Sequence, residues 1–284
     1  MLELKGKPVA DQIYQNISEE FKKWTSKNWN PPSLAVILVG ENKASQVYVK
    51  NKQQACEKLG FRSRLITLPT TVSEAHLSDQ IKELNANSSV DAILLQLPLP
   101  EHINSKNMTE SIDASKDADA LTTESMGKLM TGQQIVSSCT PAGIIEILKF
   151  YNIDIAGKEA LVIGRSQIVG LPLFHLLNQL NATVTLAHSK TANLSSLLTR
   201  FDFVFVAVGR AHFLKVVEFK KGAVVVDVGI HRTSTGLIGD VDSAGAADYL
   251  SALTPVPGGV GPMTIAVLMQ NTFKLAERIR KKDS

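Results

Sequence analysis

Short apolar segments that recur about one helix apart restrict the fold of this chain more than any other feature of its sequence. The first series comprises residues 33–39, 64–68 and 91–95, with helical patterns between them. Continuous apolar strands of this kind suit a parallel sheet that is covered on both faces. We therefore predict an α/β domain in the N-terminal part of the chain.

A second series of apolar segments follows, at residues 160–163, 182–187, 203–208 and 223–228. Strands separated by about one helix each are typical of a doubly wound domain that binds a nucleotide. A chain of 284 residues also exceeds the usual size of one hydrophobic core. We therefore predict two domains, both of the α/β class.

The boundary between these domains is predicted at the end of a polar segment. Residues 105–138 are rich in Ser, Thr, Asp and Lys and show no clear period. Thr140 is predicted to cap a helix over residues 141–151. Residues 264–282 carry a helical stripe of apolar side chains. The predicted domains are residues 1–140, rejoined by the C-terminal helix at 264–284, and residues 141–263.

Composition and charge exclude several classes of protein. The chain has 30 basic and 27 acidic residues and a net charge of +3, which is too mild for a nucleic-acid partner. The one basic run, at residues 278–282, is predicted to be the solvated end of a helix. No apolar stretch approaches the roughly 18 residues of a membrane span, and the N-terminus lacks a signal core. We therefore expect a cytoplasmic protein with no membrane partner.

The two cysteines give no support for a disulfide or a metal site. Cys56 and Cys139 lie far apart and lack the spacing of a Cys-x-x-Cys or Cys/His ligand set. We interpret both as small buried thiols and predict no metal.

A glycine-containing turn after the strand at 160–163 is the candidate cofactor site. Gly164 would allow a tight turn, and Gly170 would allow a helix to start close to the strand and direct its N-terminus at a pyrophosphate. The spacing departs from Gly-x-Gly-x-x-Gly, so a purely structural strand-turn-helix remains an alternative. No acidic residue follows the next strand, where Ser189 and Lys190 stand. Together with Arg165 they suit a ribose phosphate, which favours NADP over NAD.

A helix predicted over residues 43–59 carries the candidate reactive groups, and Gly60 is placed to end it. Ser45, Tyr48 and Lys52 stand at i, i+3 and i+7 and therefore share a face. Val47, Ala55 and Leu59 are predicted to lie on another face. Polar residues on an exposed helix, with no role in a reaction, are the alternative interpretation.

Further polar side chains follow the strand at 91–95. Gln96 would lie at the same sheet edge as Lys52 if their two strands are parallel, and prolines stiffen the loop after it. A lysine normally titrates near pH ~10.4, so burial or hydrogen bonding has to lower its pKa before it can act as a base. A glutamine could orient that amine without adding charge. Asp119 is a candidate acceptor for paired N–H donors on a ligand, or simply a loop aspartate.

The segment at residues 254–264 combines glycines and prolines. A stiff turn with little side-chain bulk would let a ligand approach the backbone. A structural crossover between the domains is the alternative.

Several motifs, in this order along the chain, resemble those of the bifunctional methylenetetrahydrofolate dehydrogenase/methenyltetrahydrofolate cyclohydrolase family. They are ASQVYVKNK at 44–52, LLQLPLP at 94–100, CTPAGI at 139–144, GRSQIVGLP at 164–172, VVDVGI at 225–230, GDVD at 239–242 and TPVPGGVGPMT at 254–264. The resemblance implies an N-terminal α/β folate-binding domain, a Rossmann-like NADP-binding domain, a cleft between them and a homodimer.

The resemblance also implies roles for individual residues. Lys52 would handle protons and assist water attack, Gln96 would support it, Tyr48 would lie against the folate, and Asp119 would hold the pterin. The remaining substrate-binding positions would be Ser45, Leu97, Pro98, Val256, Pro257 and Gly259. Cofactor-binding positions would be Thr140, Gly164, Arg165, Ser166, Ile168, His188, Ser189, Val208, Gly209, Gly229 and Ile230.

The chain departs from the family pattern near two of these sites. Ala118 and Ala120 replace a valine and a glycine beside Asp119, and Thr122, Thr123 and Ser125 replace the usual His-Pro-x-Asn. Ser138 stands where a proline is usual, and His231 where an asparagine is common. These changes remove no proposed catalytic group but affect the loop around Asp119.

The resemblance implies an enzyme of one-carbon metabolism. It would oxidise methylene-tetrahydrofolate to methenyl-tetrahydrofolate with NADP and hydrolyse the product to 10-formyl-tetrahydrofolate. The alternatives are an NAD(P) dehydrogenase for another small substrate and a nucleotide-binding regulator without catalysis.

Overall fold

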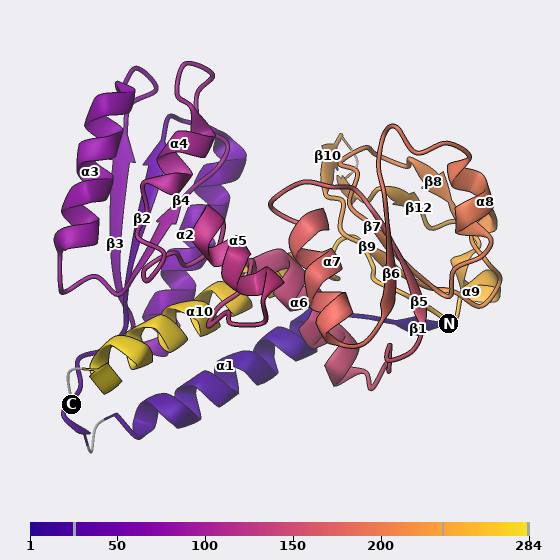
Figure 1. Ribbon diagram of the computed structural model, residues 1–284, viewed down its shortest axis with the longest axis horizontal. Coiled ribbons are helices and arrows are strands. Elements are labelled where there is room, and N and C mark those ends of the chain that lie inside the picture. The colour runs from indigo at the N-terminus through magenta and orange to yellow at the C-terminus, as the bar shows by residue number, and fades with distance from the viewer. Residues whose placement is uncertain (25–26, 235, 283–284) are drawn as a thin grey trace. The chain divides into compact units, whose positions relative to one another are not determined.

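The computed structural model describes residues 1–24, 27–234 and 236–282, and the chain forms two compact units (Figure 1). The first unit contains Met1–Asp11 and Ser138–Thr264, and the second contains Gln12–Ser137 and Ile265–Ser284. The predicted boundary at residue 140 lies close to the observed one. Residues 1–11, however, belong with the later part of the chain, because β1 (Leu2–Glu3) pairs with β13 (Ala252–Leu253).

The second unit is built on a parallel sheet with the strand order β3-β2-β4. Its strands are β2 (Ser33–Val39), β3 (Arg62–Leu68) and β4 (Ala92–Leu95). Every residue of β2 and β4 is buried, as expected for continuous apolar strands. Ile37 pairs with Leu95, which brings the carboxyl ends of β2 and β4 to the same edge of the sheet.

Helix α2 (Lys43–Leu59) begins and ends at the predicted residues. The Asn42 side chain accepts a hydrogen bond from the N–H of Ser45 at its start, and Gly60 ends it with a left-handed φ of 73°. Val47 is 51% exposed whereas Ala55 and Leu59 are buried, so the prediction that these three share a face is wrong. Helix α3 (Glu74–Ala86) buries Leu77, Ile81 and Leu84.

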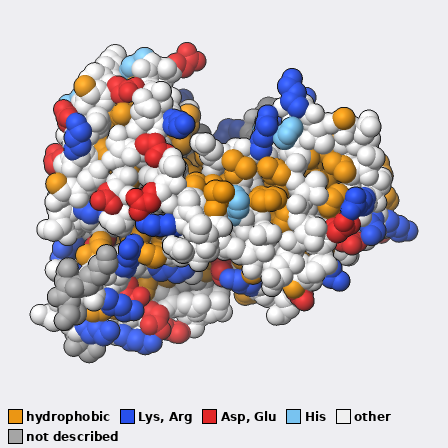
Figure 2. All heavy atoms as spheres, viewed as in Figure 1, with side chains coloured by type: hydrophobic (Ala, Val, Ile, Leu, Met, Phe, Trp, Pro, Cys, Tyr) orange, Lys and Arg blue, Asp and Glu red, His pale blue; other side chains and the backbone are white. Residues whose placement is uncertain are grey.

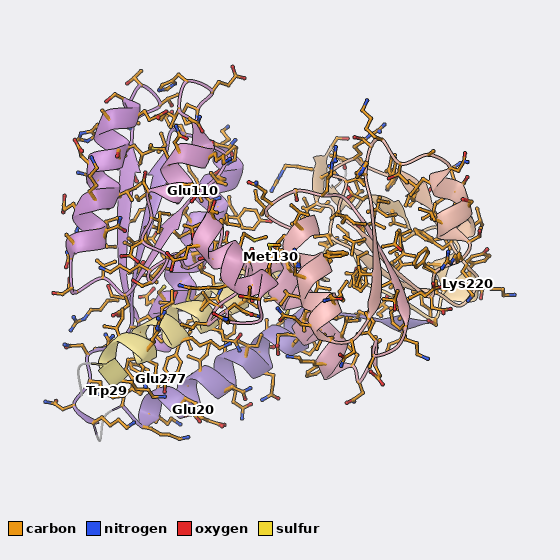
Figure 3. All side chains as sticks on the ribbon, in the orientation of Figure 1. Glu20, Trp29, Glu110, Met130, Lys220 and Glu277 are labelled. Carbon is orange, nitrogen blue, oxygen red and sulfur yellow. The ribbon has the colours of Figure 1, made fainter. Side chains whose placement is uncertain are left out.

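The segment at residues 105–138 is more regular than its sequence suggested. It contains α4 (Ser105–Glu110) and α5 (Thr123–Met130). Glu110, labelled in Figure 3, accepts hydrogen bonds from the N–H and the hydroxyl of Thr123 and so ties the end of α4 to the start of α5. Both helices are too short to show a hydrophobic period, and side-chain hydrogen bonds define their ends.

Helices α1 (Gly6–Lys22) and α10 (Gly261–Lys282) each contribute residues to both units. In the second unit, Trp24 stacks on Phe273 of α10 with ring centroids 4.9 Å apart. The basic end of α10 was predicted to be solvated, and for Arg280 this is wrong. Its guanidinium binds both carboxyl oxygens of the buried Asp91, at 2.7 and 3.0 Å, and lies over Trp24. This ion pair connects α10 to Asp91, the residue that precedes β4.

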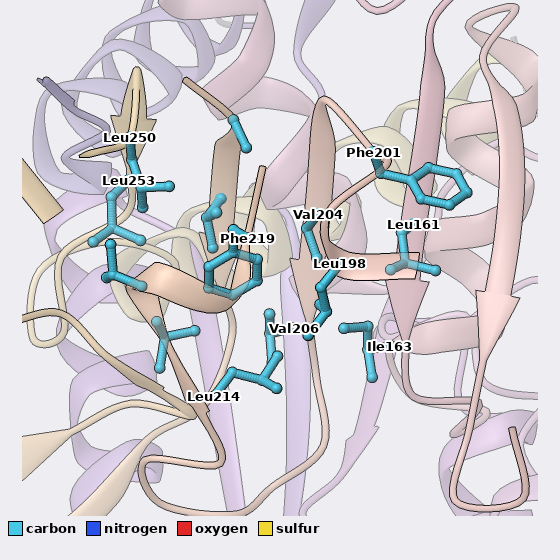
Figure 4. Close-up of a cluster of buried hydrophobic side chains, with 14 of the residues drawn as sticks. Leu161, Ile163, Leu198, Phe201, Val204, Val206, Leu214, Phe219, Leu250 and Leu253 are labelled. Carbon is cyan, nitrogen blue, oxygen red and sulfur yellow. The ribbon is translucent and has the colours of Figure 1, made fainter. Parts of the chain in front are cut away.

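The first unit contains a parallel sheet with the strand order β1-β13-β9-β7-β5-β6. Besides β1 and β13, its strands are β5 (Glu159–Ile163), β6 (Thr183–Ala187), β7 (Phe203–Val206) and β9 (Val224–Asp227). The α/β class and the parallel sheets are confirmed. Figure 4 shows part of the core beside this sheet, where Phe201, Phe219 and Leu250 pack against the strand residues.

Helix α6 (Cys139–Phe150) begins earlier than predicted. Ser138 occupies the N-cap position without a side-chain capping bond, so the prediction that Thr140 caps this helix is wrong. Thr140 lies within the first turn, and its hydroxyl is 3.0 Å from that of Thr264. Both cysteines are buried thiols, as predicted, and burial raises the pKa of the Cys56 thiol to about 11.

The remaining elements of the first unit are short. They are α7 (Gly170–Gln179), α8 (Leu194–Leu198), α9 (Ala246–Tyr249), β8 (Leu214–Lys215) paired with β12 (Val241–Asp242), and the hairpin of β10 (His231–Thr233) and β11 (Gly236–Ile238). On the face shown in Figure 2, apolar side chains gather over the unit that contains α7. Within the described ranges, no helix has the length and apolar character needed to cross a membrane.

Candidate active site

Three polar side chains of α2 lie on its inner face. Ser45 is 5% exposed and Lys52 is 6% exposed, whereas Tyr48 is half-buried. Val49 and Cys56, at i−3 and i+4 from Lys52 on the same helix, are also buried. A lysine that is almost fully buried is unusual, because removal of an ammonium group from water is unfavourable without polar partners.

Gln96 supplies such a partner to Lys52. The Lys52 Nζ donates a hydrogen bond of 2.7 Å to Gln96 Oε1. The Gln96 Nε2 donates to the carbonyl oxygen of Leu97 at 2.7 Å, which orients the amide so that its oxygen faces the lysine. Because β2 and β4 are parallel, the helix after β2 and the loop after β4 start from the same sheet edge. The structure therefore brings Lys52 and Gln96 together as their positions in the sequence suggested.

Asp119 belongs to a loop that runs beside β4. The N–H of Ile93 donates to the carbonyl oxygen of Lys116 at 2.7 Å, and the N–H of Ala118 donates to the carbonyl oxygen of Ile93 at 3.2 Å. Asn271 of α10 donates to the Ala118 carbonyl oxygen at 2.9 Å. Asp119 is half-buried and follows this fixed stretch directly.

The unusual residues around Asp119 are accommodated in the structure. Ala120 has a φ of 52°, a left-handed conformation that glycine adopts more easily. Thr122 caps α5 by accepting from the N–H of Ser125 at 3.2 Å. The buried Asp117 accepts from the Thr122 N–H and the Ser125 hydroxyl, at 2.9 and 2.8 Å. The loop therefore keeps a defined shape without the residues that are usual in the family pattern.

The loop is also anchored at Lys116. Its Nζ donates to the carbonyl oxygens of Leu84, Asn85 and Asn87, at the C-terminal end of α3, at 3.1, 2.7 and 2.8 Å. A cation at this position compensates the negative end of the helix dipole. Burial nevertheless lowers the pKa of Lys116. Lys116 thus has a structural explanation and needs no part in a reaction.

In the first unit, both glycines of the predicted cofactor turn are required by close backbone contacts. A Cβ atom at Gly164, whose φ is 125°, would lie 2.2 Å from the carbonyl oxygen of Ala207. A Cβ atom at Gly170 would lie 1.9 Å from the carbonyl oxygen of Gly164. Helix α7 therefore starts directly against the end of β5, as the turn predicted. The Ser166 hydroxyl accepts from the Val169 N–H at 3.2 Å and closes the turn.

This turn forms one side of a cavity of about 470 Å³ in the first unit. Six predicted cofactor residues line it, namely Gly164, Arg165, Ser166, His188, Ser189 and Val208. Sequence reasoning missed Thr191, Leu194, Arg210 and Phe213, which also line it. The loops after β6 and β7 both start at the sheet edge where the glycine turn follows β5. This shared edge was the feature of the sequence that could have identified these residues. Among the described residues that line the cavity, none is acidic.

The other predicted cofactor residues lie outside the lining of this cavity. They are Thr140, Ile168, Gly209, Gly229 and Ile230. Ile168 and Ile230 are 43% and 42% exposed, which is unusual for large apolar side chains. Ile230 also lies near the start of α10, because a Cβ atom at Gly261 would be 3.3 Å from its Cδ1.

Packing explains part of the glycine-rich segment before α10. A Cβ atom at Gly6 would lie 2.0 Å from the carbonyl oxygen of Gly259, and the Gly6 N–H donates to the Gly258 carbonyl oxygen at 2.8 Å. A Cβ atom at Gly259 would lie 2.6 Å from the carbonyl oxygen of Pro255. The small residues here thus allow close contacts between backbone segments of the same unit. Val256 is half-buried and Pro257 is exposed.

Two protein-family models match most of the chain. The model described as the tetrahydrofolate dehydrogenase/cyclohydrolase catalytic domain matches residues 4–119, and the model for the NAD(P)-binding domain of the same family matches residues 138–280. The chain belongs to this family. It is therefore a bifunctional enzyme, with dehydrogenase and cyclohydrolase activities on tetrahydrofolate derivatives.

Individual members of the family are similar over their whole length. The bifunctional protein FolD of Bdellovibrio bacteriovorus is 48% identical over 280 residues, which are 98% of this chain and 97% of that protein. The crystal structure of the Campylobacter jejuni FolD enzyme has a TM-score of 0.94 and 43% identity, covering 98% of this chain and 99% of that one. The Trypanosoma brucei enzyme, solved with NADP cofactor and an inhibitor, has a TM-score of 0.92 and 33% identity, covering 99% of both chains.

Proposed function

We propose that this enzyme oxidises methylene-tetrahydrofolate with NADP and then hydrolyses the methenyl product at Lys52. The assignment of the hydrolytic step to Lys52 is supported by one observation: a lysine that is only 6% exposed donates a 2.7 Å hydrogen bond to Gln96. A buried amine that an amide oxygen orients is suited to exchange a proton with a substrate held beside it.

The cavity beside Gly164 fits a dinucleotide phosphate. The close start of α7 leaves backbone exposed to a ligand at the turn, and Arg165, Ser166 and Ser189 supply a guanidinium and hydroxyls. No carboxylate lines the described part of the cavity to hold a free ribose 2′-hydroxyl, so a phosphorylated ribose is the better match. The NADP in the Trypanosoma brucei structure supports this choice. A bound nicotinamide supplies the acceptor for the hydride.

The folate is proposed to bind at the sheet edge of the second unit, with Tyr48 along its ring system and Asp119 accepting pterin N–H donors. Tyr48 and Lys52 share a face of α2, and Asp119 follows a stretch hydrogen-bonded to β4. Ser45, Leu97, Pro98, Val256, Pro257 and Gly259 complete the proposed set of contacts, and Ile168, Gly209, Gly229, Ile230 and Thr140 the cofactor set.

Lys52 performs the proton transfers of the hydrolytic step. Its amine accepts a proton from the water that attacks the methenyl carbon, so an O–H bond breaks as the C–O bond forms. The same proton then passes to the ring nitrogen as its C–N bond breaks, and the hydroxyl of the adduct loses its remaining proton to solvent as the formyl C=O bond forms. Gln96 holds the Nζ in place through its oxygen, and the bond from Gln96 to Leu97 prevents the amide from presenting its nitrogen instead.

A spectrophotometric assay tests the overall activity. Methylene-tetrahydrofolate is supplied with NADP or with NAD while the absorbance of the methenyl product and of the reduced nicotinamide is followed. We expect reduction of NADP in preference to NAD, and no reduction with either would overturn the proposal. Activity on a different hydroxy or amino acid, with none on folates, would favour an NAD(P) dehydrogenase of another kind.

Replacement of Lys52 tests its role. Lys52→Met should abolish hydrolysis of added methenyl-tetrahydrofolate while NADP binding persists, because the amine acts in the second unit and the dinucleotide cavity lies in the first. The matched control is Lys50→Met, which changes an exposed lysine of the same helix. Full hydrolysis by Lys52→Met would defeat the assignment.

The proposal includes a homodimer and a cytoplasmic location, both of which the family resemblance supports. Analytical ultracentrifugation of the purified chain would test the first, and cell fractionation the second. A monomer at all concentrations, or recovery outside the cytoplasmic fraction, would contradict them.

A further inference from the structure

The loop that follows β7 in the first unit directs three successive N–H groups at one side chain. Val208 and Gly209 donate to Asp240 Oδ2 at 2.8 and 3.0 Å, and Arg210 donates to Asp240 Oδ1 at 2.9 Å. Successive backbone N–H groups that converge in this way form a concave site for an anion. Here the site is filled by Asp240, whose side chain is fully buried.

This arrangement determines how the loop can meet a ligand. Val208 and Arg210 line the cavity assigned to the dinucleotide, but their N–H groups are already engaged by Asp240. The loop therefore presents its outer surface and its side chains to the cavity. Arg210 is among them, with its guanidinium 4.9 Å from the centroid of the Phe213 ring, which lines the same cavity.

Asp240 is itself held firmly. Its backbone N–H donates to Asp227 at 3.0 Å, and Asp227 also accepts from the N–H groups of Gly229 and Val241, both at 2.9 Å. The His231 Nε2 lies 2.7 Å from Asp240 Oδ1. A Cβ atom at Gly229 would lie 2.3 Å from that same oxygen, so the glycine leaves the space that the Asp240 carboxyl group occupies.

We propose that Asp240 is a positioning residue for the dinucleotide. Its side chain fixes the backbone of residues 208–210 and thereby the wall of the cavity on which the cofactor rests. The inference depends on the proposed function, because that function assigns the cavity to NADP. Hydrolysis of methenyl-tetrahydrofolate needs no dinucleotide and uses Lys52 in the second unit, so the effect of Asp240 is confined to the dehydrogenase step.

Asp240→Asn is the direct test. The amide has the shape of the carboxyl group but only one acceptor oxygen, so at least one of the three loop N–H groups loses its partner. We expect the KM and the Kd for NADP to rise by about 10- to 100-fold, the factor that one or two hydrogen bonds to a charged group represent. The kcat at saturating NADP should change much less, and hydrolysis of added methenyl-tetrahydrofolate should keep its wild-type rate. Asp248→Asn, at an exposed acidic residue of the same unit, is the matched control.

A second pair of variants decides the matter if Asp240→Asn does not fold. His231→Gln keeps a side-chain donor for Asp240, whereas His231→Leu removes it, and both lose the imidazole ring. We expect His231→Leu to weaken NADP binding and His231→Gln to restore most of it.

The results that would overturn the inference are distinct from those that would overturn the proposed function. A folded Asp240→Asn enzyme with unchanged NADP binding, or one whose two activities fall by the same factor, would refute a positioning role. Equal NADP binding by the two His231 variants would do the same. A wild-type enzyme that reduces no NADP with methylene-tetrahydrofolate would instead refute the proposed function itself.

Discussion

Replacement of Gln96 by glutamate would place a carboxylate against the Lys52 amine at the point where a neutral oxygen now lies. The Lys52 Nζ is 2.7 Å from Gln96 Oε1, and glutamate has nearly the shape of glutamine. The substitution therefore adds a charge with little change in volume. An opposite charge stabilises the ammonium form of the lysine and so opposes its use as a base.

The magnitude follows from the distance and the burial. A carboxylate shares its charge between two oxygens, so the centre of that charge lies farther from the Nζ than the nearer oxygen does; two unit charges about 4 Å apart attract by about 4 kcal/mol at an effective dielectric constant of about 20. That energy corresponds to about three pH units at ~1.4 kcal/mol per unit. Shifts beside a single opposite charge are about 1 to 3 units in proteins. We therefore expect the pH midpoint of the hydrolysis rate to move upward by about 1 to 3 units, which is about a 10- to 1000-fold loss on the acidic side of the midpoint.

The assay follows the disappearance of added methenyl-tetrahydrofolate over a range of pH, with the spontaneous reaction subtracted. The rate at high pH should return toward that of the wild type, because the amine is then neutral in both proteins. NADP binding should be unchanged. Gln54→Glu, at an exposed glutamine of the same helix, controls for the added charge. An unmoved midpoint, or a loss of rate by the same factor at every pH, would refute the view that Lys52 exchanges the proton.

Three further predictions concern the stability of the two units. Ser138 is buried, and its hydroxyl has no hydrogen-bond partner among the described residues, so Ser138→Ala should raise the free energy of unfolding by about 1 kcal/mol; a lower urea midpoint would contradict this. Arg280→Leu should lower the free energy of unfolding by about 3 to 5 kcal/mol because it leaves Asp91 buried without its ion pair. Lys281→Leu, which removes the more exposed Lys281–Glu277 ion pair, should lower the free energy of unfolding by less than about 1 kcal/mol. Equal effects of Arg280→Leu and Lys281→Leu would refute the greater importance of the buried pair. Burial raises the pKa of Asp227 from 3.8 to about 6, so the folded state holds its proton more tightly than the unfolded state does between these values. Its contribution to stability is therefore greatest at low pH and declines by about 3 kcal/mol as the pH rises to about 6. Asp227→Asn should lack this decline, and parallel pH curves for the wild type and the variant would contradict the shift.

The sequence by itself determined the class of fold and most of the strands. Continuous apolar runs such as residues 33–39 can be buried only in a sheet that is covered on both faces, so burial and local pattern agree. The sequence also predicted the bounds of α2, where Asn42 and Gly60 determine its two ends with side-chain and backbone hydrogen bonds of their own. The motifs that resemble the family pointed to the lysine site and the glycine turn.

Other features were decided only by the tertiary structure, since they depend on partners far away in the sequence. The two-residue strands β1 and β13 have no pattern of their own and exist because they pair with each other across 250 positions, as Leu2 does with Ala252. Arg280 was expected in solvent because its neighbours are basic, but the buried Asp91 lies 189 residues away. Four groups contact the Asp240 carboxyl: the N–H groups of residues 208–210, about 30 positions before Asp240, and His231 of β10. Their spacing in the sequence gives no sign of this arrangement. Periodicity describes which face of an element is buried, whereas an individual polar group finds its partner only when the folded chain brings the two together.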